Sequence, residues 1–241
     1  MRISLSALFT MVAVLAITPA ALASSLCPNT ADVSGGINAT YTSGSNCAET
    51  MSINNSQDYA RLMWNTGSTG YPANLTLSNI GSITASVANS GSGQPYYMLV
   101  FQASNVSLGQ AVSTDQILML EFQNTTLSGV GNDTLAFDPN ITLFNLYDNT
   151  TGNYLLNGTE NPAGQQNAHT LDYWLGVYPG LSIDAIQQIR LAIGLGGGSG
   201  PGESLTVYSA DVTATPEPSS LLLLGTGLLG LGFLVFRKVM V

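Results

Sequence analysis

The feature that most constrains the fold of this chain is a series of short apolar runs separated by turn-forming residues. In the clearest run, 188–195, isoleucine or leucine occupies every second position, and Gln188 and Arg190 fall in the other phase. This period of two predicts a β-strand with one apolar face. Similar runs lie at 97–101, 117–122 and 141–147, bounded by Gly, Asn, Asp or Pro. Around ten such strands predict an all-β protein, an antiparallel, jelly-roll-like β-sandwich.

Weaker strand signals lie at 60–64, 75–78, 83–88 and 134–137. The last run, 204–213, has Leu205 and Val207 in one phase but Ala210 and Val212 in the other, which predicts a β-bulge. Helix is expected only as short turns at 171–177 and at 182–188, the second capped by Ser182. Near the end, a Trp-bearing segment, an alternating strand, a glycine-rich loop and a final strand follow one another. This order resembles the closing strands of carbohydrate-binding jelly rolls.

The N-terminus has the features of a signal peptide. Arg2 supplies a positive charge, an apolar stretch covers 5–17, and Ala21 and Ala23 are small residues at the positions that a signal peptidase recognises. We therefore expect residues 1–23 to be removed, so that the mature chain begins at Ser24. A retained membrane anchor is the alternative.

The C-terminus combines a short polar motif, an apolar run and a basic pair. Pro216, Glu217 and Pro218 form the motif, and Arg237 and Lys238 follow the run 221–236. As a helix, this run is about 24 Å long, close to the shortest length that spans a membrane. We expect a transmembrane helix over 219–236, with Arg237 and Lys238 as a cytoplasmic stop and the preceding domain on the far side.

Segment 216–241 resembles the PEP-CTERM sorting signal of Gram-negative bacteria. The resemblance implies export, transient inner-membrane anchoring through the C-terminal helix, and processing by an exosortase-type enzyme near Pro216, Glu217 and Pro218. It further implies a final place at the cell surface, in the outer membrane or outside the cell, and an exopolysaccharide as a possible partner. One departure is that Val239, Met240 and Val241 follow the basic pair.

Residues 24–215 remain for one domain, the predicted sandwich ectodomain, and this length suffices for a real core. The whole chain is 8% charged, whereas roughly 25% is usual. Between Ser24 and Thr215 the only basic residues are Arg61 and Arg190. So acidic a surface repels nucleic acid and anionic lipid. Neutral glycans and divalent cations are compatible with it.

Cys27 and Cys47 are the only cysteines. In an exported chain, two cysteines near the start of the mature region predict a disulfide. Closing this loop would stabilise the fold by about 3 kcal/mol. Two free thiols or a metal site are poorer alternatives, because the only histidine, His169, is far away in the sequence.

Acidic turns offer oxygen ligands of the kind that bind calcium. Asp133, Asp138 and Asp148 lie in segments rich in Asn, Thr and Gly, but no segment has the full alternation of a known calcium loop. Asp and Asn are also what tight turns need. Turn chemistry is therefore the favoured interpretation, a structural calcium is the alternative, and no other cofactor is expected.

Catalytic patterns are weak in this sequence. The glycine-rich loop 194–202 lacks the Lys-Ser/Thr of a phosphate cradle and is expected to be a strand connector. His169 is expected to face solvent or to cap a turn. A glycosidase needs two carboxylates, but spacing selects no pair among the five candidates, which are Asp115, Glu121, Glu160, Asp172 and Glu203.

Several aromatic residues are candidates to stack on sugar rings: Tyr96, Tyr97, Tyr147, Tyr154, Tyr173, Trp174 and Tyr178. Trp64 and Trp174 are expected in the core, because a sandwich with few large side chains needs them there. The leading hypothesis is a non-enzymatic, exported surface or matrix protein. The alternatives are a carbohydrate-binding module, with tyrosines on one sheet face or on a rim of loops, and a hydrolase acting on polysaccharide.

Overall fold

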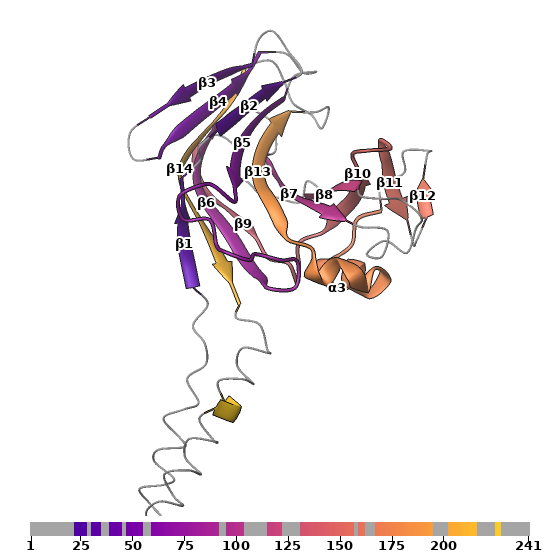
Figure 1. Cartoon of the computed structure of the whole chain (residues 1–241). Coiled ribbons are helices and arrows are strands. Elements are labelled where there is room, and N and C mark those ends of the chain that lie inside the picture. Colours follow the sequence, from indigo (N-terminus) through magenta and orange to yellow (C-terminus); the bar gives the residue numbers. More distant parts are fainter. Residues whose placement is uncertain are drawn as a thin grey trace, which may run out of the picture. The chain divides into compact units, whose positions relative to one another are not determined.

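Alternating apolar side chains organise residues 23–214 into two antiparallel sheets (Figure 1). The computed structural model describes residues 22–27, 30–34, 39–44, 47–54, 59–91, 95–103, 115–121, 131–156, 159–161, 167–194, 202–215 and 225–227. Contacts divide the chain into two units, Ala23–Ala214 and a second unit formed by Met1–Leu22 with Thr215–Val241. Within the second unit, the described residues 225–227 are helical.

The smaller sheet has six strands and the last strand of the sandwich at its centre. In spatial order, its strands are β3 (Thr40–Ser43), β4 (Glu49–Ile53), β14 (Glu203–Ala214), β6 (Ile80–Ser90) and β9 (Gly131–Phe137), and β1 (Leu22–Leu26) also pairs with β14. The register of β14 against β6 shifts between Val207 and Ser209. This bulge, which the phase change predicted, keeps both halves of β14 facing the core.

The larger sheet has eight strands. In spatial order they are β12 (Thr159–Asn161), β11 (Asn153–Leu156), β10 (Phe144–Asp148), β8 (Asp115–Glu121), β7 (Tyr96–Ala103), β13 (Ile186–Gly194), β5 (Tyr59–Asn65) and β2 (Thr30–Ser34). Each of its neighbouring pairs is antiparallel. In Figure 1, β13 bends strongly along its length, so the sheet is curved.

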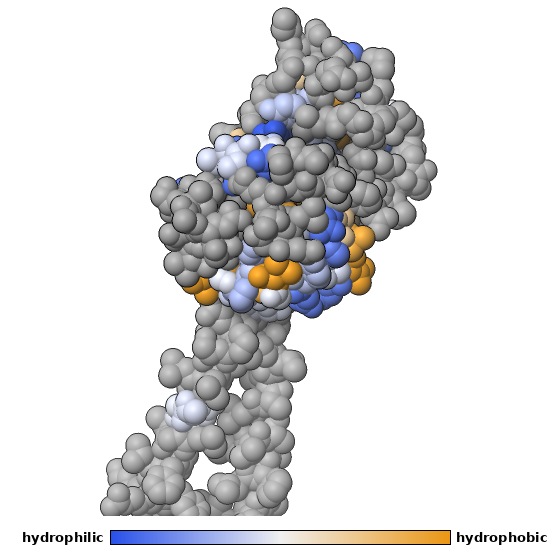
Figure 2. Space-filling model, turned by 90° about the vertical axis from the view of Figure 1, so that its right-hand side faces the viewer, coloured by the Kyte–Doolittle hydropathy of each residue, from blue (hydrophilic) through white to orange (hydrophobic). Residues whose placement is uncertain are grey.

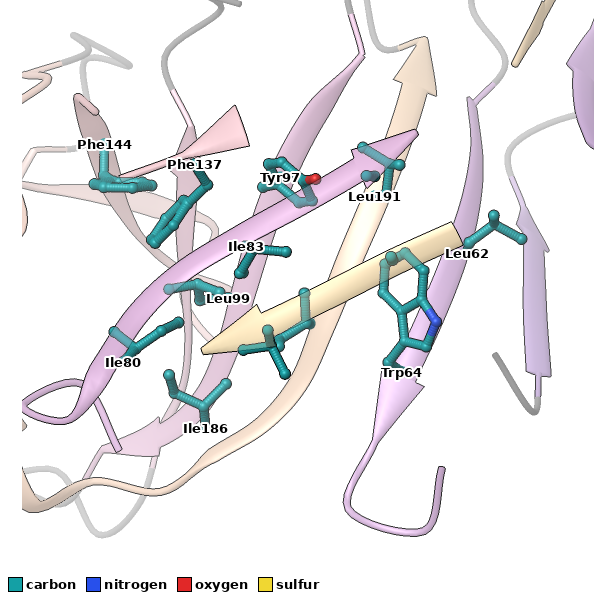
Figure 3. Packing of buried hydrophobic residues seen from close by; sticks show 14 of the residues in the cluster. Leu62, Trp64, Ile80, Ile83, Tyr97, Leu99, Phe137, Phe144, Ile186 and Leu191 are labelled. Atoms are coloured by element: carbon teal, nitrogen blue, oxygen red, sulfur yellow. The ribbon is translucent and has the colours of Figure 1, made fainter. Parts of the chain in front are cut away.

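The core lies between the two sheets. On β5, Ala60, Leu62 and Trp64 are fully buried, and the residues between them are only half-buried. Ile83 of β6 packs into the same cluster as Tyr97 and Leu99 of β7, as Figure 3 shows. Trp64 and Trp174 both have no exposed surface, which confirms the prediction that they belong to the core.

The predicted strand at 75–78 is wrong. This segment forms a turn with one isolated bridge, between Thr76 and Ala185. The side chain of Asn79 makes the turn, because its Oδ1 accepts from the backbone N–H of Thr76 at 2.7 Å and its amide donates to the carbonyl of Asn74 at 2.9 Å. A side chain that satisfies the local backbone groups competes with strand pairing. The predicted strand at 141–147 likewise begins only at Phe144, after a turn.

One of the two expected helices is present. Helix α3 (Leu171–Val177) matches the first prediction, and Thr170 caps it by accepting from the N–H of Tyr173. The prediction at 182–188 is wrong, since a 3-10 helix, η1 (Pro179–Ile183), precedes it and β13 begins at Ile186. Ser182 donates its hydroxyl back to the carbonyl of Pro179 at 2.8 Å, so it closes η1 and starts no new helix.

A disulfide joins the two cysteines of the chain, Cys27 and Cys47. Cys27 follows β1, and Cys47 lies in the turn before β4 with a positive φ of 63°. The backbone N–H of Cys27 also donates to the carbonyl of Thr69 at 3.2 Å. The bond therefore ties the N-terminal strand of the domain to the edge of the six-stranded sheet.

Candidate ligand-binding face

The candidate site is the face of the eight-stranded sheet that points away from the core, called the outer face below. On each strand its residues alternate with those of the core cluster. The residues are Tyr59, Arg61, Met63 and Asn65 on β5; Gln188, Arg190 and Ala192 on β13; Tyr96, Met98, Val100 and Gln102 on β7; Asn145 and Tyr147 on β10; and Tyr154 on β11.

Strand register arranges these residues in three rows across the sheet. The first row runs from position 32 on β2 through Arg61 and Ala192 to Tyr96. The second has Arg190 between Met63 and Met98, and it continues through position 120 to Asn145. The third row contains Asn65, Gln188, Val100, Leu118, Tyr147, Tyr154 and Asn161. Each of the first two rows therefore contains one arginine and ends, in the direction of β10, on a polar side chain.

The centre of the outer face is buried and apolar, whereas its two flanks are half-exposed. Tyr96, Met98, Val100 and Ala192 form a second hydrophobic cluster, and Tyr147 packs against it. The β5 flank presents half-buried side chains from Tyr59 to Asn65. On the other flank, the ring of Tyr147 meets the ring of Tyr154 edge-on, with 5.2 Å between centroids. The face thus offers aromatic surface on both sides of a closed centre.

Both basic residues of the segment from Ser24 to Thr215 lie on this face. The guanidinium carbon of Arg61 lies 4.0 Å from the centroid of the Tyr59 ring, a cation–π contact. Arg190 is 9% exposed. Its Nε and Nη2 donate to Oε1 of Gln188 at 2.9 and 2.6 Å, which fixes the direction of the guanidinium along β13.

Among the described residues, the buried polar atoms of the outer face that lack a hydrogen-bond partner include the hydroxyl of Tyr96 and Oδ1 of Asn145, whose residues are 6% and 4% exposed. Burial raises the pKa of Tyr96 to about 12, the nearby Arg61 lowers this pKa, and Tyr59 and Tyr154 raise it. Leaving such a group unsatisfied costs about 1–3 kcal/mol.

The other aromatic candidates lie elsewhere. Tyr97, Trp174 and Tyr178 are buried in the core. Tyr173 lies on α3 and stacks on the ring of His169, with 3.6 Å between centroids. His169 is half-buried, and its backbone bridges to Phe144. The expectation that His169 faces solvent or caps the turn was therefore wrong, because Thr170 is the cap and the imidazole packs on a tyrosine.

The five candidate carboxylates are spread over several elements. Glu203 is buried at the start of β14, in the other sheet, and Asp172 is exposed on α3. Asp115 and Glu121 lie on β8, in register with Ala103 and Phe144, and Glu160 lies on β12, in register with Leu155.

The calcium candidates are not gathered either. Asp138 lies before β10, Asp148 is the last residue of β10, and Asp133 lies on β9 in the other sheet. Oδ1 of Asp138 accepts from the backbone N–H of Asn140 at 2.8 Å, and Oδ1 of Asp148 accepts from that of Thr150 at 2.7 Å. Within the described ranges, no three His, Cys, Asp or Glu side chains are grouped as a metal site would require.

Most sorting residues lie outside the described residues, namely Ala21, Pro216, Glu217, Pro218, Arg237 and Lys238. Ala23 lies within β1. For the part of the chain that is described, no helix has the length and hydrophobicity needed to span a membrane. Of the predicted span 219–236, only the helical residues 225–227 are described.

The exposed large hydrophobic side chains of the described surface lie away from the outer face. They are Ile141 in the turn before β10, Ile183 at the end of η1 and Tyr208 on β14. On the face that Figure 2 shows, the described surface has small orange patches among blue and white ones. The outer face is therefore distinguished by its tyrosines and arginines, and not by exposed aliphatic surface.

Sequence reasoning missed Tyr59, Arg61 and Arg190 as site residues. The signal was the alternation on each strand, in which Tyr59 and Arg61 occupy the phase opposite to Ala60, Leu62 and Trp64. The sequence does not show that β5 and β13 are neighbours, and this pairing is what brings the two arginines together.

Residues 214–238 match the family model of the PEP-CTERM protein-sorting motif. No curated protein sequence matches the chain. The family 11 carbohydrate-binding module from Clostridium thermocellum, in complex with a mixed-linked tetrasaccharide, is a similar solved structure, with 11% identity, a TM-score of 0.38, and coverage of 81% of this chain and 97% of the module.

Two further structures show a similar degree of likeness. The solution structure of CtCBM11 has 12% identity and a TM-score of 0.42, over 83% of this chain and 100% of the module. Winged bean acidic lectin has 11% identity and a TM-score of 0.39, over 81% of this chain and 98% of the lectin. Likenesses at these scores do not identify a ligand.

Proposed function

We propose that this chain, an exported protein with a PEP-CTERM protein-sorting motif at residues 214–238, is a non-enzymatic cell-surface or matrix protein whose sandwich binds a polysaccharide. The motif implies sorting by exosortase and anchoring through the C-terminus before processing. The segment 1–23 serves as a cleaved signal peptide, 24–215 as the ectodomain and 216–241 as the disposable anchor. Exopolysaccharide outside the cell is the partner.

The observation that carries the binding role is the composition of the outer face. Tyr59, Tyr147 and Tyr154 offer half-exposed rings on its two flanks, and apolar ring faces suit the C–H surfaces of sugars. A polysaccharide complements this arrangement, because successive sugars can cover the rings on the flanks.

Binding of the host's own exopolysaccharide to the segment Ala23–Ala214 tests the ectodomain. This segment is one compact unit with its own core, so it is a suitable fragment. We expect Tyr154→Ala to weaken binding about tenfold, equivalent to about 1.4 kcal/mol. Tyr208→Ala is the matched control, since Tyr208 is an exposed tyrosine (48%) on β14 of the other sheet. Equal losses for both variants, or no binding at all, would contradict the proposed site.

Cell fractionation tests the sorting role. We expect the mature protein outside the cytoplasmic membrane in an exosortase-positive host. Deletion of Pro216, Glu217 and Pro218 should leave it anchored there with its C-terminus intact. If the unaltered chain also stays in the cytoplasmic membrane with nothing outside, the proposed route fails, whatever the glycan measurements show.

A further inference from the structure

One end of the sandwich is defined by the point where its last strand finishes. Ala214, the final residue of β14, pairs with Ile80, the first residue of β6. Ile83, three residues further along β6, pairs with Phe137, the last residue of β9. In Figure 1, helix α3 lies at the same lower end of the sandwich as the arrowhead of β14. This end, where the chain leaves the domain, is called the exit end below.

Among the exposed large hydrophobic side chains of the described residues, Ile141 and Ile183 lie at the exit end. They are 74% and 79% exposed. Ile141 lies in the turn that follows β9. The carbonyl of Pro139, in the same turn, accepts from the backbone N–H of Leu171 at the start of α3, at 3.3 Å. The turn that presents Ile141 is therefore joined to the helix of the exit end.

Ile183 reaches the same end by a different route. It is the last residue of η1, two residues before the isolated bridge between Ala185 and Thr76. The carbonyl of Thr76 accepts from the N–H of Ile80 at 3.1 Å, which connects this bridge to the first residue of β6. Two separate turns thus present one isoleucine each. In Figure 2, orange patches of the described surface lie near its lower end.

The chain itself keeps the exit end near a membrane while its C-terminus is anchored. The PEP-CTERM motif begins at residue 214, where β14 ends, and we expect the transmembrane helix to begin at residue 219. Five residue steps span at most about 18 Å when fully extended. A connection this short gives the exit end a high effective concentration at the bilayer, so a weak contact with lipid suffices for docking.

The charges of the exit end indicate which kind of lipid it fits. Asp138 and Asp184 lie in its turns and Asp172 lies on α3, whereas the arginines of the described residues, Arg61 and Arg190, lie on the outer face. Anionic headgroups attract lysine and arginine, and carboxylates repel them. Isoleucine side chains partition into the boundary between headgroups and acyl chains without needing a charge. The exit end therefore fits a zwitterionic bilayer surface.

We infer that the exit end docks on a zwitterionic bilayer, with Ile141 and Ile183 inserted at the headgroup boundary, for as long as the C-terminal anchor is present. This inference rests on the proposed function, because the anchor supplies the short connection. The two side chains and the connection make three points of attachment, which restrict tilting of the domain. Docking would thus present the segment after Ala214 to a membrane-bound processing enzyme in one orientation.

A tryptophan placed at the exit end tests the docking. Trp64 and Trp174 are fully buried, so the wild type supplies the background. Residues 24–241 carrying Ile183→Trp are reconstituted in phosphatidylcholine bilayers with and without brominated acyl chains, which quench nearby indoles. We expect the added emission to fall by about half, because the indole would lie at the acyl boundary. Ser90→Trp is the matched control, exposed at the other end of β6 and about 33 Å from Ile80, and should not be quenched.

A second substitution separates docking from mere proximity. Ile141→Asp added to Ile183→Trp should remove most of the quenching, because a carboxylate opposes insertion, and the exposure of Ile141 makes it harmless to the fold. Replacing part of the phosphatidylcholine with phosphatidylglycerol should also reduce quenching at low salt. Quenching that is unchanged by Ile141→Asp, equal in Ser90→Trp, or stronger with the anionic lipid would overturn the inference.

The same samples distinguish failure of the inference from failure of the anchor. A chain that sediments with the bilayers but shows no quenching at Ile183→Trp would overturn the docking and leave the proposed function standing. A chain that does not associate with bilayers at all would overturn both. If quenching is absent and Ile183→Asp slows C-terminal processing in an exosortase-positive host, the isoleucine contacts the processing enzyme and the assignment to lipid is wrong.

Discussion

Trp64 and Trp174 allow one energetic argument to be tested with a single substitution. Both side chains have no exposed surface, so both bury the same indole. They differ in whether the indole N–H has a hydrogen-bond acceptor. In Trp174, Nε1 donates to the carbonyl of Phe144 at 2.9 Å, whereas Nε1 of Trp64 is buried and has no hydrogen-bond partner among the described residues. Trp→Phe at each site therefore changes the same volume and removes a satisfied N–H in one case and an unsatisfied N–H in the other.

The expected losses follow from these contacts. Trp→Phe removes about 40 Å³, which at the usual cavity and transfer costs destabilises by about 1–2 kcal/mol at either site. At Trp174 the lost hydrogen bond adds about 1 kcal/mol; Phe144 keeps its other donor, the N–H of His169 at 2.9 Å in the backbone bridge. At Trp64, removing an unsatisfied donor returns about 1–2 kcal/mol. The two variants should differ by about 2–3 kcal/mol.

Thermal and denaturant unfolding of Ala23–Ala214, followed by circular dichroism, measure this difference. A domain of this size loses about 2–4 °C in Tm per kcal/mol. We expect Trp174→Phe to unfold about 4–12 °C below Trp64→Phe, with the wild type close to the latter. Equal Tm values, or a larger loss at Trp64, would refute the reasoning from the indole N–H.

Three further predictions concern stability. Reducing Cys27 and Cys47 should cost about 3 kcal/mol and lower Tm by about 6–12 °C; an unchanged melting curve with dithiothreitol would contradict this. Tyr96→Phe should stabilise by about 1 kcal/mol at neutral pH, because it removes a buried unpartnered hydroxyl; a lower Tm for this variant would contradict the prediction. The pKa of Tyr96 is about 12 in the fold against 10.0 in its absence, so the wild type alone should lose stability from Tyr96 as pH rises from 10 to 12. Gly70→Ala should destabilise the fold by more than about 2 kcal/mol, because φ is +80° and a Cβ would lie 1.8 Å from a β1 backbone oxygen. Gly176→Ala on α3 is the control. A Cβ there would meet nothing within 4 Å, so this variant should be more stable by about 0.5–1 kcal/mol.

Strands with clear alternation were predictable from sequence, because an apolar residue at every second position reflects burial of one face of the strand. The run that became β13 and the phase change in β14 are examples, and both appear in the structure. The structures of segments 75–78 and 182–188 could not be predicted in this way. There, hydrogen bonds of Asn79 and the proline of η1 determine the backbone conformation, whatever the spacing of the apolar residues.

The outer face could not be predicted from the sequence for a different reason. Arg61 and Arg190 come from strands far apart in the sequence, and only the pairing of β5 with β13 makes them neighbours. Tyr147 and Tyr154 are an intermediate case, since a short hairpin joins β10 to β11 and places them opposite each other. Local pairs can be inferred from a sequence, whereas a surface assembled from distant strands requires the topology.

The position of β14 has a consequence for the order of events during export. It is the last strand of the sandwich, yet it lies between β4 and β6, and β13 likewise lies between β7 and β5. Neither sheet is continuous until these two strands are available, so we expect the chain to cross the membrane unfolded and to fold late. A chain truncated before Glu203 should therefore stay sensitive to protease. Both sheets would become complete only as the sorting segment reaches the membrane. Folding of the domain would therefore coincide with the end of translocation.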